Sequence, residues 1–150
     1  MKKRHSKPGI YIEAELLDAK AFQELTRRDL DVYFLFLRKR QVKNLGQGQG
    51  KRREKVVLNN GQIIFPYREA EEALRMKPGS FTRCLDHLIE LGFIEIARPG
   101  GFCAGANEPA LYTISERWRK YGKPDFKETP RKKKSVRVGF QNKRVPYGKS

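Results

Sequence analysis

The segment PGSFTRCLDHLIELGFIEI, residues 78–96, combines the pattern of a helix with that of a strand. From Ser80 onward, apolar residues recur at helical spacing, which predicts a helix with one buried face. That face would consist of Phe81, Cys84, Leu85, Leu88 and Ile89. Gly92 is expected to cap the end of the helix, and the alternation in FIEIA (93–97) predicts a half-buried strand.

The outward face of the same helix would carry polar and charged side chains. Its members are Thr82, Arg83, Asp86, His87 and Glu90. An arginine on an exposed helix face is most often only solvated. Arg83 is therefore a candidate binding residue only if the rest of the chain points to a partner.

A second helix is predicted nearer the N-terminus. Thr26 followed by Asp29 is typical of a helix start, because the hydroxyl can cap free backbone N–H groups. In LDVYFLFLRKRQVK (30–43), Leu30, Phe34 and Leu37 share one face, and further apolar residues widen it. We expect this helix to be the central one of the core. The preceding ELLDAKAFQEL (15–25) loosely suits a short helix.

Turn signals divide the region between these two helices. In VVLNNGQIIF (56–65), the Asn60-Gly61 pair predicts a tight hairpin that joins two short strands. YREAEEALRM (67–76) has the pattern of a short helix. KPG (77–79) is expected to be the turn that ends it, because a proline disfavours the helical conformation of the preceding residue.

The chain after residue 97 predicts a second strand and a last short helix. RPGGFCAGANEP (98–109) reads as a long glycine-rich connection, after which ALYTIS (110–115) can pair with FIEIA as a hairpin. Ser115 would cap the helix that follows, and Trp118 would pack back on the core.

Composition predicts one domain with polar extensions. The chain has 150 residues, of which 38% are hydrophobic. We expect a basic flexible arm (1–11), a folded domain (12–121) that contains a mobile Gly-rich basic loop (43–55), and a basic disordered tail (122–150). No window has the length and apolarity of a membrane span or of a signal peptide. We expect a cytoplasmic protein whose two cysteines are reduced thiols.

The formal net charge of +16 is unevenly distributed. Residues 1–9, 43–55 and 122–150 hold the entire excess, because basic and acidic residues are equally frequent in the rest of the chain. A neutral body with cationic extensions fits a polyanionic partner better than an acidic small molecule. The alternative is that the basic segments only aid solubility.

No enzymatic site or cofactor is expected. GQGQGK (46–51) lacks the spacing of a phosphate-binding loop, and Arg52 stands where that motif has Ser or Thr. The only histidines are His5 and His87, and no metal set or nucleophile with its base can be assembled at recognisable spacing.

The order helix, hairpin, short helix, turn, helix and long hairpin resembles the winged helix-turn-helix family. EALRMKPGSFTRCLDHLIELGFIEI (72–96) is similar to the family's short second helix, turn, recognition helix and entry into the wing. The resemblance covers residues 21–121 and implies an α+β fold with a three-helix core and a β-hairpin wing. The general layout is also similar to winged-helix modules of phage and plasmid replication proteins.

The resemblance implies binding of double-stranded DNA, with the helix in the major groove and the wing on the adjoining backbone or minor groove. The recognition-helix residues facing the groove would be Ser80, Thr82, Arg83 and His87, and the turn and wing would add Lys77 and Arg98. Phosphates would be contacted from the loop and tail by Lys51, Arg52, Arg53, Arg131, Lys132, Lys133 and Lys134. The wing has one cation, Arg98, and an acid, Glu108, so it is expected to contact DNA weakly or to meet a protein partner.

Several alternatives stay open at this point. The DNA-binding protein could be a transcriptional regulator or a replication-initiation factor of a bacterium or mobile element, and it could act as a monomer or a homodimer. The chain could instead bind RNA through its tail, although its strand aromatics are spaced as core residues. In a third alternative, the fold is a protein-interaction module whose contact face includes Asp86, Glu90 and the wing.

Overall fold

The chain folds into a mixture of helices and small antiparallel sheets. The computed structural model describes residues 9–45, 54–103 and 105–129. Most of the predicted basic arm, loop and tail lies outside the described residues, and so do Lys51, Arg52, Arg53, Arg131, Lys132, Lys133 and Lys134.

The helices in the described part of the chain are α1 (Ala14–Asp18), α2 (Lys20–Gln23), α3 (Arg27–Arg38), α4 (Tyr67–Leu74), α5 (Pro78–Leu91) and the short 3-10 helix η1 (Arg117–Lys120). The strands are β1 (Val42–Leu45), β2 (Glu54–Val57), β3 (Ile63–Ile64), β4 (Ile94–Arg98), β5 (Gly101–Cys103), β6 (Ala106–Glu108) and β7 (Leu111–Ile114). The central sheet has the order β3-β7-β4, while β1-β2 and β5-β6 are separate two-stranded ribbons.

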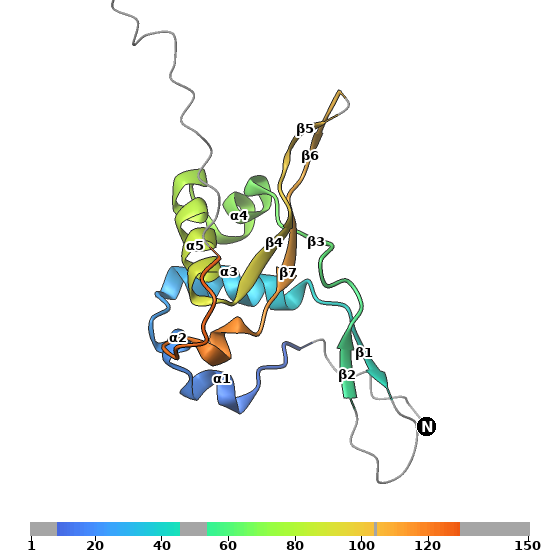
Figure 1. Cartoon of the computed structure of the whole chain (residues 1–150). Helices are drawn as coiled ribbons and strands as arrows, with labels where there is room; N and C mark the ends of the chain where they lie inside the picture. Colours follow the sequence, from blue (N-terminus) through green and yellow to red (C-terminus); the bar gives the residue numbers. More distant parts are fainter. Residues whose placement is uncertain (1–8, 46–53, 104, 130–150) are drawn as a thin grey trace, which may run out of the picture.

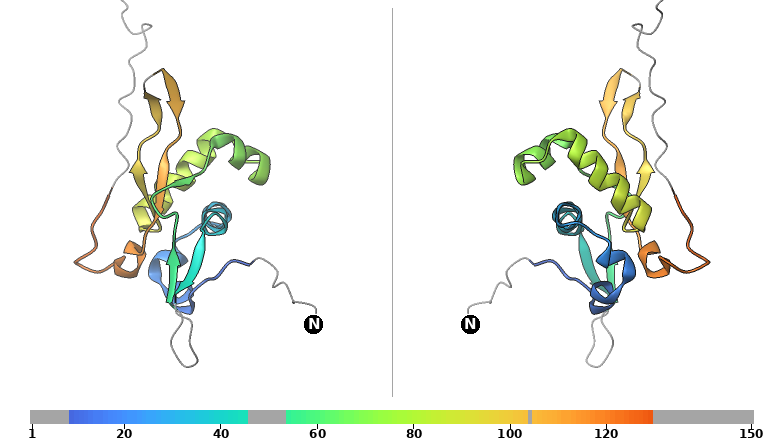
Figure 2. Two further views of the ribbon diagram at one scale, coloured as in Figure 1. Left: turned by 90° about the vertical axis from the view of Figure 1, so that its right-hand side faces the viewer. Right: turned by 90° about the vertical axis from the view of Figure 1, so that its left-hand side faces the viewer.

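The two ribbons project from opposite parts of the body (Figure 1). The β5–β6 ribbon continues β4 and β7 past the end of the molecule at which α4 and the start of α5 lie, and both views of Figure 2 show the same arrangement. Helices α1, α2 and η1 gather at the other end, near the start of the β1–β2 ribbon.

Helix α3 starts as the sequence predicts. Thr26 is its N-cap, its hydroxyl accepts a hydrogen bond from the Asp29 backbone N–H, and the Asp29 carboxylate accepts one from the Thr26 backbone N–H at 2.9 Å. This reciprocal pair satisfies two N–H groups that the first turn of a helix leaves unpaired.

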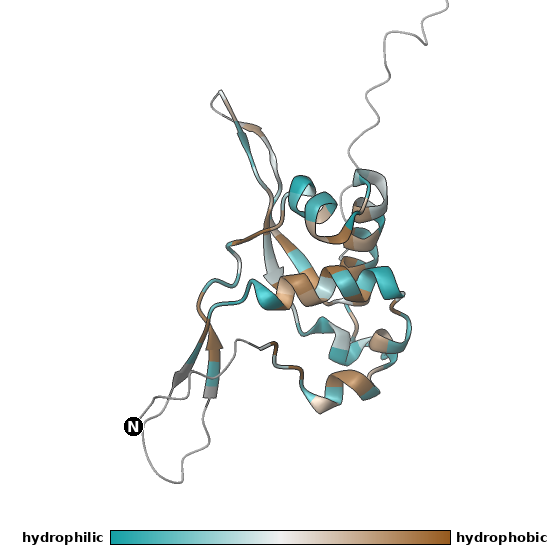
Figure 3. Ribbon diagram, turned by 180° about the vertical axis from the view of Figure 1, so that it is seen from behind, coloured by the Kyte–Doolittle hydropathy of each residue, from teal (hydrophilic) through white to brown (hydrophobic). Residues whose placement is uncertain are grey.

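The buried face of α3 is rotated from the predicted one. Polar and apolar residues alternate along the helix (Figure 3), but Leu30 and Phe34 are only half-buried. The apolar residues of α3 that are buried are Val32, Tyr33, Phe36 and Leu37. Leu37, Val32 and Phe36 thus belong to the wide apolar face as predicted, and only the choice of Leu30 and Phe34 as its centre is wrong. Apolar residues cover most of the circumference of α3, so the pattern alone does not say which side meets the sheet.

Aromatic rings join α3, the sheet and α5 into one core. The Phe36 ring lies 5.0 Å from that of Phe65, which in turn lies 4.8 Å from Phe81 of α5. Phe93, which directly precedes β4, packs against Tyr33 with ring centroids 5.0 Å apart and stacks on Trp118 of η1 at 6.2 Å. The fixed core therefore holds α5 against α3 along its apolar face.

The predicted hairpin at Asn60-Gly61 is wrong, although the turn itself is present. Gly61 has a φ of 85°, but β2 pairs with β1 and β3 pairs with β7. The Asn60 side chain accepts a hydrogen bond from the Ile114 N–H at 2.7 Å and donates one to the Ile114 carbonyl at 3.2 Å. These bonds tie the turn to β7, so the two flanking strands separate instead of pairing with each other.

The β1–β2 ribbon occupies both ends of the stretch predicted as a mobile loop (43–55). Val42 pairs with Val57, and Leu45 pairs with Glu54. The ribbon is closed at its base, where the Leu58 N–H donates to the Gln41 carbonyl at 2.8 Å and the Gln41 N–H donates to the Asn59 side chain at 2.9 Å. β-branched residues at 42, 56 and 57 favour strands at this base.

The second hairpin is longer than predicted. β4 and β7 pair as expected, with Ile96 opposite Tyr112. The connection 98–109, which the sequence analysis treated as irregular, contains β5 and β6, with Phe102 opposite Asn107. At the junction, a Cβ on Gly100 would lie 2.7 Å from the Ala110 backbone nitrogen, so only glycine allows this close approach.

The last predicted element forms as a 3-10 helix instead of an α-helix. Its N-cap is Glu116 and not the predicted Ser115, although the Ser115 hydroxyl accepts a hydrogen bond from the Arg117 N–H at 3.2 Å. Trp118 is buried against the core, as expected. In the part of the chain that the structure describes, no helix has the length and apolarity needed to cross a bilayer.

Candidate nucleic-acid interface

Helices α4 and α5 are joined by only three residues, Arg75–Lys77. Arg75 ends α4 in the left-handed conformation, with a φ of 50°. Pro78, predicted to belong to the turn, is instead the first residue of α5. A proline fits this position because its fixed φ suits the helix and its missing N–H would have had no partner.

The start of α5 exposes backbone N–H groups. Lys77 occupies the N-cap position and its side chain makes no capping hydrogen bond. A Cβ on Gly79 would meet no atom within 4 Å, so the backbone here is open to an approaching group. Uncapped N–H groups and the helix dipole together favour an anion at such a helix start.

Arg83 lies on the exposed face one turn further along α5. Its guanidinium has no hydrogen bond or ion pair with any residue in the described ranges. Lys77 is also exposed, and Ser80 between them is half-buried. Arg75, which the sequence analysis did not select, adds a third exposed cation beside the start of α5.

Thr82 is committed to contacts within the protein. Its hydroxyl donates to the Pro78 carbonyl at 3.0 Å and lies 3.0 Å from the Tyr67 hydroxyl of α4. The Tyr67 ring packs edge-on against Phe81 at 5.2 Å. Thr82 therefore helps to hold α4 against the start of α5, and Tyr67 brings an exposed phenol to the same surface. Tyr67 was not predicted from the sequence because its position opens a helix and belongs to no motif.

The predicted place of His87 on the outward face is wrong. Its Nδ1 lies 2.7 Å from Oδ2 of Asp29, a buried residue of α3. Position 87 borders the buried face of α5 at the point where α3 begins, so the imidazole turns toward the carboxylate. His87 thus links α5 to α3 and does not point into the region in front of Arg83.

Charges along the exposed face of α5 are separated. The cations Arg75, Lys77 and Arg83 precede or occupy its first half, and the exposed acids Asp86 and Glu90 follow. A polyanion would be attracted to the first half of α5 and repelled by the second half. The arrangement therefore limits the candidate interface to the region around Lys77 and Arg83.

Asp29 is the buried carboxylate of the described core, and it accepts hydrogen bonds from Thr26 and contacts His87. Its burial raises the pKa, but hydrogen bonds from Thr26 and His87 outweigh burial and hold the pKa below its usual value of 3.8. Burial and the hydrogen bond with Asp29 raise the pKa of the Cys84 thiol to about 12. Cys84 is a free and buried thiol, as expected, and it is uncharged at neutral pH.

Asp29→Asn should lower the free energy of unfolding at pH 7 by about 1.5–3 kcal/mol, because hydrogen bonds to a charged group contribute about that much. The folded-state pKa lies below the unfolded value, so this contribution is present above about pH 4 and is lost as pH falls through the folded pKa. Urea denaturation at pH 7 and pH 3 would measure the free energy of unfolding of both proteins. The difference between wild type and variant should be smaller at pH 3 than at pH 7. Asp18→Asn, at an exposed position of α1, is the matched control. An equal gap at both pH values would contradict the prediction.

The β5–β6 ribbon carries little available charge. Arg98, predicted to contact DNA, forms an ion pair with Glu108 at 3.2 Å, and both side chains are about half exposed, at 50% and 43%. The ribbon also presents Phe102, which is 74% exposed and was not selected from the sequence. No periodic pattern surrounds Phe102, so the sequence gives no signal of its exposure.

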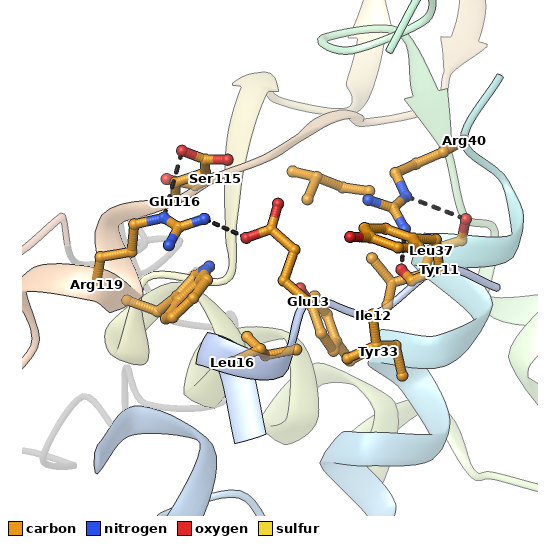
Figure 4. A pocket seen from close by; sticks show the side chains of 12 residues that line it. Tyr11, Ile12, Glu13, Leu16, Tyr33, Leu37, Arg40, Ser115, Glu116 and Arg119 are labelled. Carbon is orange, nitrogen blue, oxygen red and sulfur yellow. Dashed lines mark hydrogen bonds and ion pairs between the residues drawn. The ribbon is translucent and has the colours of Figure 1, made fainter. Parts of the chain in front are cut away.

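A small hollow lies at the other end of the molecule, between the segment leading into α1, α3 and η1 (Figure 4). Arg119 forms ion pairs there with Glu13, and the Arg40 guanidinium donates to the Tyr11 carbonyl at 2.9 Å. Its volume of about 60 Å³ is far below the several hundred Å³ of ordinary ligand pockets. The hollow is therefore too small for a substrate or cofactor.

Among residues 9–45, 54–103 and 105–129, no group of three or more His, Cys, Asp or Glu side chains is placed to hold a metal ion. Comparison with known proteins adds no relative, since no protein-family model, curated protein or solved structure matches this chain.

Proposed function

We propose that the chain binds double-stranded DNA as a winged helix-turn-helix protein, with α5 in the major groove and the hairpin from β4 to β7 as the wing. The order of elements supports this proposal. Helix α3 precedes β3, α4 and α5 follow as a closely joined pair, and β4 and β7 complete a sheet of order β3-β7-β4. In this fold the helix after the short turn is the one that reads base edges.

The exposed guanidinium of Arg83 is the observation that carries the proposal. Arginine can donate two hydrogen bonds to the O6 and N7 atoms of guanine, the commonest base-specific contact in the major groove. Arg83 stands on the outer face of a helix whose inner face is fixed by Phe81 and Leu85. A rigidly seated helix can hold such a fork in one orientation, which sequence-specific recognition requires.

Neighbouring groups would position the phosphates. The open N–H groups at Gly79 and Ser80, with the exposed Arg75 and Lys77 beside them, suit one or two backbone phosphates. The sequence adds an excess of cations outside this surface, which would supply salt-dependent affinity without sequence preference. Affinity and specificity would then come from different parts of the chain.

Selection from random duplexes tests the proposal. Full-length protein is incubated with random double-stranded DNA at about 0.2 M salt, where purely electrostatic binding is weak, and the retained duplexes are sequenced. We expect one enriched motif that contains guanine. A palindromic motif would indicate a dimer, because two-fold symmetry in the protein is mirrored in its site.

Arg83→Ala should abolish the preference for guanine in that motif, at a cost of about 1–3 kcal/mol, or roughly 5–150-fold in affinity for the enriched duplex. Arg38→Ala is the matched control, because Arg38 is also exposed but lies in the last turn of α3, away from the start of α5. Its motif should equal that of the wild type. An unchanged motif in Arg83→Ala would refute the role of α5 as the reader.

A protein-interaction module is the second candidate function. The paired charges of Arg98 and Glu108 and the exposed acids Asp86 and Glu90 favour it, because they weaken the attraction of a duplex. In that case the selection would yield no motif, and Arg83→Ala would leave binding to nucleic acid unchanged.

A further inference from the structure

Phe102 differs from every other phenylalanine in the described part of the chain. It is 74% exposed, whereas the others are buried or half-buried. Single exposed apolar residues are common on protein surfaces and need no partner. The surroundings of Phe102 must therefore decide whether its exposure has a use.

Residues with little or no side chain surround Phe102 in the ribbon. Gly101 has an ordinary φ, and a Cβ there would meet nothing within 4 Å, so no internal packing requires a glycine at this position. Gly105 likewise has open space around it, although its φ of 83° does favour glycine. Ala106 adds a small side chain on the opposite strand. Small side chains around Phe102 would let its ring reach into the minor groove of B-DNA, which is only about 6 Å wide, without the neighbouring residues blocking the approach.

Beyond the Arg98–Glu108 ion pair, the ribbon carries no formal charge. From residue 99 to residue 107 the sequence PGGFCAGAN contains no Lys, Arg, Asp or Glu. A tip without cations cannot grip phosphates by charge, and a tip without acids is not repelled by them. Such a tip suits the floor of a groove better than its phosphate rim.

Asn107 lies directly opposite Phe102 in the ladder, so both side chains stand on one face of the ribbon. Minor-groove binders commonly combine an amide or cationic side chain, which reads the acceptors of A·T pairs, with an apolar side chain that enters between base pairs. Phe102 and Asn107 supply these two components side by side. Both are exposed.

The ribbon extends past the end of the molecule at which α5 begins (Figures 1 and 2). A duplex seated on Arg83 and the start of α5 would therefore present its adjoining minor groove to the ribbon.

We infer that Phe102 is a wedge that inserts between two base pairs in the minor groove and kinks the duplex, with Asn107 favouring an A·T pair beside it. This inference rests on the proposed binding of double-stranded DNA. Partial unstacking by an apolar wedge bends DNA by roughly 20–90° toward the major groove. The wing would then add sequence specificity by favouring DNA that kinks easily, while α5 would add specificity through direct contacts with bases.

The test uses full-length protein and a duplex of about 30 base pairs retained in the selection. Donor and acceptor dyes at its two ends report bending, and 2-aminopurine placed at successive steps reports unstacking. Wild-type protein should shorten the end-to-end distance and raise the fluorescence of 2-aminopurine at one step. Phe102→Ala should lose both signals, keep the guanine-containing motif, and lose no more than about tenfold in affinity, because unstacking offsets much of what insertion gains.

Phe102→Leu should retain the bend, since leucine is also an effective wedge. Leu17→Ala, at a 54% exposed apolar position of α1, is the matched control and should behave as wild type. Asn107→Ala should keep the bend and lose the preference for A·T at the kinked step. These variants change exposed side chains, and their melting temperatures should equal that of the wild type.

Three results would overturn the inference. If Phe102→Ala bends the retained duplex as the wild type does, the wedge is refuted while the role of α5 stands. A change from dimer to monomer in that variant, with bending unaltered, would instead place Phe102 in a contact between two copies of the chain. If the wild-type protein retains no duplex at all, both the wedge and the proposed DNA binding fail.

Discussion

Phe81→Ala is expected to lower the free energy of unfolding by about 3–5 kcal/mol, as truncation of a buried phenylalanine ordinarily does. Phe81 is fully buried on α5, and its ring lies 4.8 Å from Phe65 and 5.2 Å from Tyr67. Alanine would remove contacts to the segment after β3 and to α4 at once. Domains are stable by only about 5–15 kcal/mol, so the variant should be partly unfolded under mild conditions.

Urea denaturation followed by circular dichroism would measure the effect. Phe102→Ala provides a matched control, because it removes the same ring from an exposed position. It should change the free energy of unfolding by less than about 0.5 kcal/mol. Similar denaturation midpoints for the two variants would show that α5 is not seated by Phe81.

Gly92→Ala is expected to lower the free energy of unfolding by about 2–6 kcal/mol, from two separate causes. Gly92 ends α5 with a φ of 89°, a conformation that costs a non-glycine residue roughly 1–3 kcal/mol. The added Cβ would also lie 2.7 Å from the Trp118 backbone nitrogen and 2.8 Å from the Arg117 Cβ. Overpacking of this kind typically adds about 1–3 kcal/mol.

The neighbouring hydrogen bonds make this contact difficult to relax. The Trp118 N–H donates to the Gly92 carbonyl at 3.1 Å, so moving η1 away would break that bond. Gly79→Ala is the control, because position 79 has an ordinary φ and open space in the first turn of α5. It should be neutral or stabilising by up to about 1 kcal/mol. Thermal melts of both variants would test the contrast, and a melting temperature of Gly92→Ala within a degree of wild type would refute it.

Local signals in the sequence predicted the local features well. The Thr26 hydroxyl caps the start of α3 as expected, and Gly92 ends α5 in the left-handed conformation. The pairing of β4 with β7 was also predicted, because alternation on both sides of one connection leaves few other partners. Each of these features depends on residues close together in sequence.

Features that depend on distant partners were not predicted. The turn at Asn60-Gly61 was recognised, but its flanking strands pair with β1 and β7 because the Asn60 amide bonds to Ile114. The orientation of His87 depends on Asp29, a residue 58 positions away in the chain. Helical periodicity identifies the faces of a helix and does not identify which residue of another helix meets the border between them.

The candidate interface was predicted in outline only. Arg83 and Lys77 are exposed as the sequence analysis expected, whereas Thr82 is held by Tyr67 and Pro78, and Arg98 by Glu108. Each of the latter partners comes from a contact that spacing alone does not reveal. Phe102 and Tyr67 were missed because an isolated aromatic residue gives no periodic signal.

The closed base of the β1–β2 ribbon makes that ribbon an interchangeable insert. The chain leaves the body at Gln41 and returns at Leu58, whose N–H donates to the Gln41 carbonyl at 2.8 Å. Asn59 secures the same junction by bonding to the Gln41 N–H and to the Lys39 carbonyl, each at 2.9 Å. Because exit and return are adjacent, the length of the intervening chain can change without moving Gln41 or Leu58 in the body. Such a site tolerates insertions, deletions and replacement of the connecting segment. Evolution and engineering can therefore alter the β1–β2 ribbon without refolding the rest of the domain.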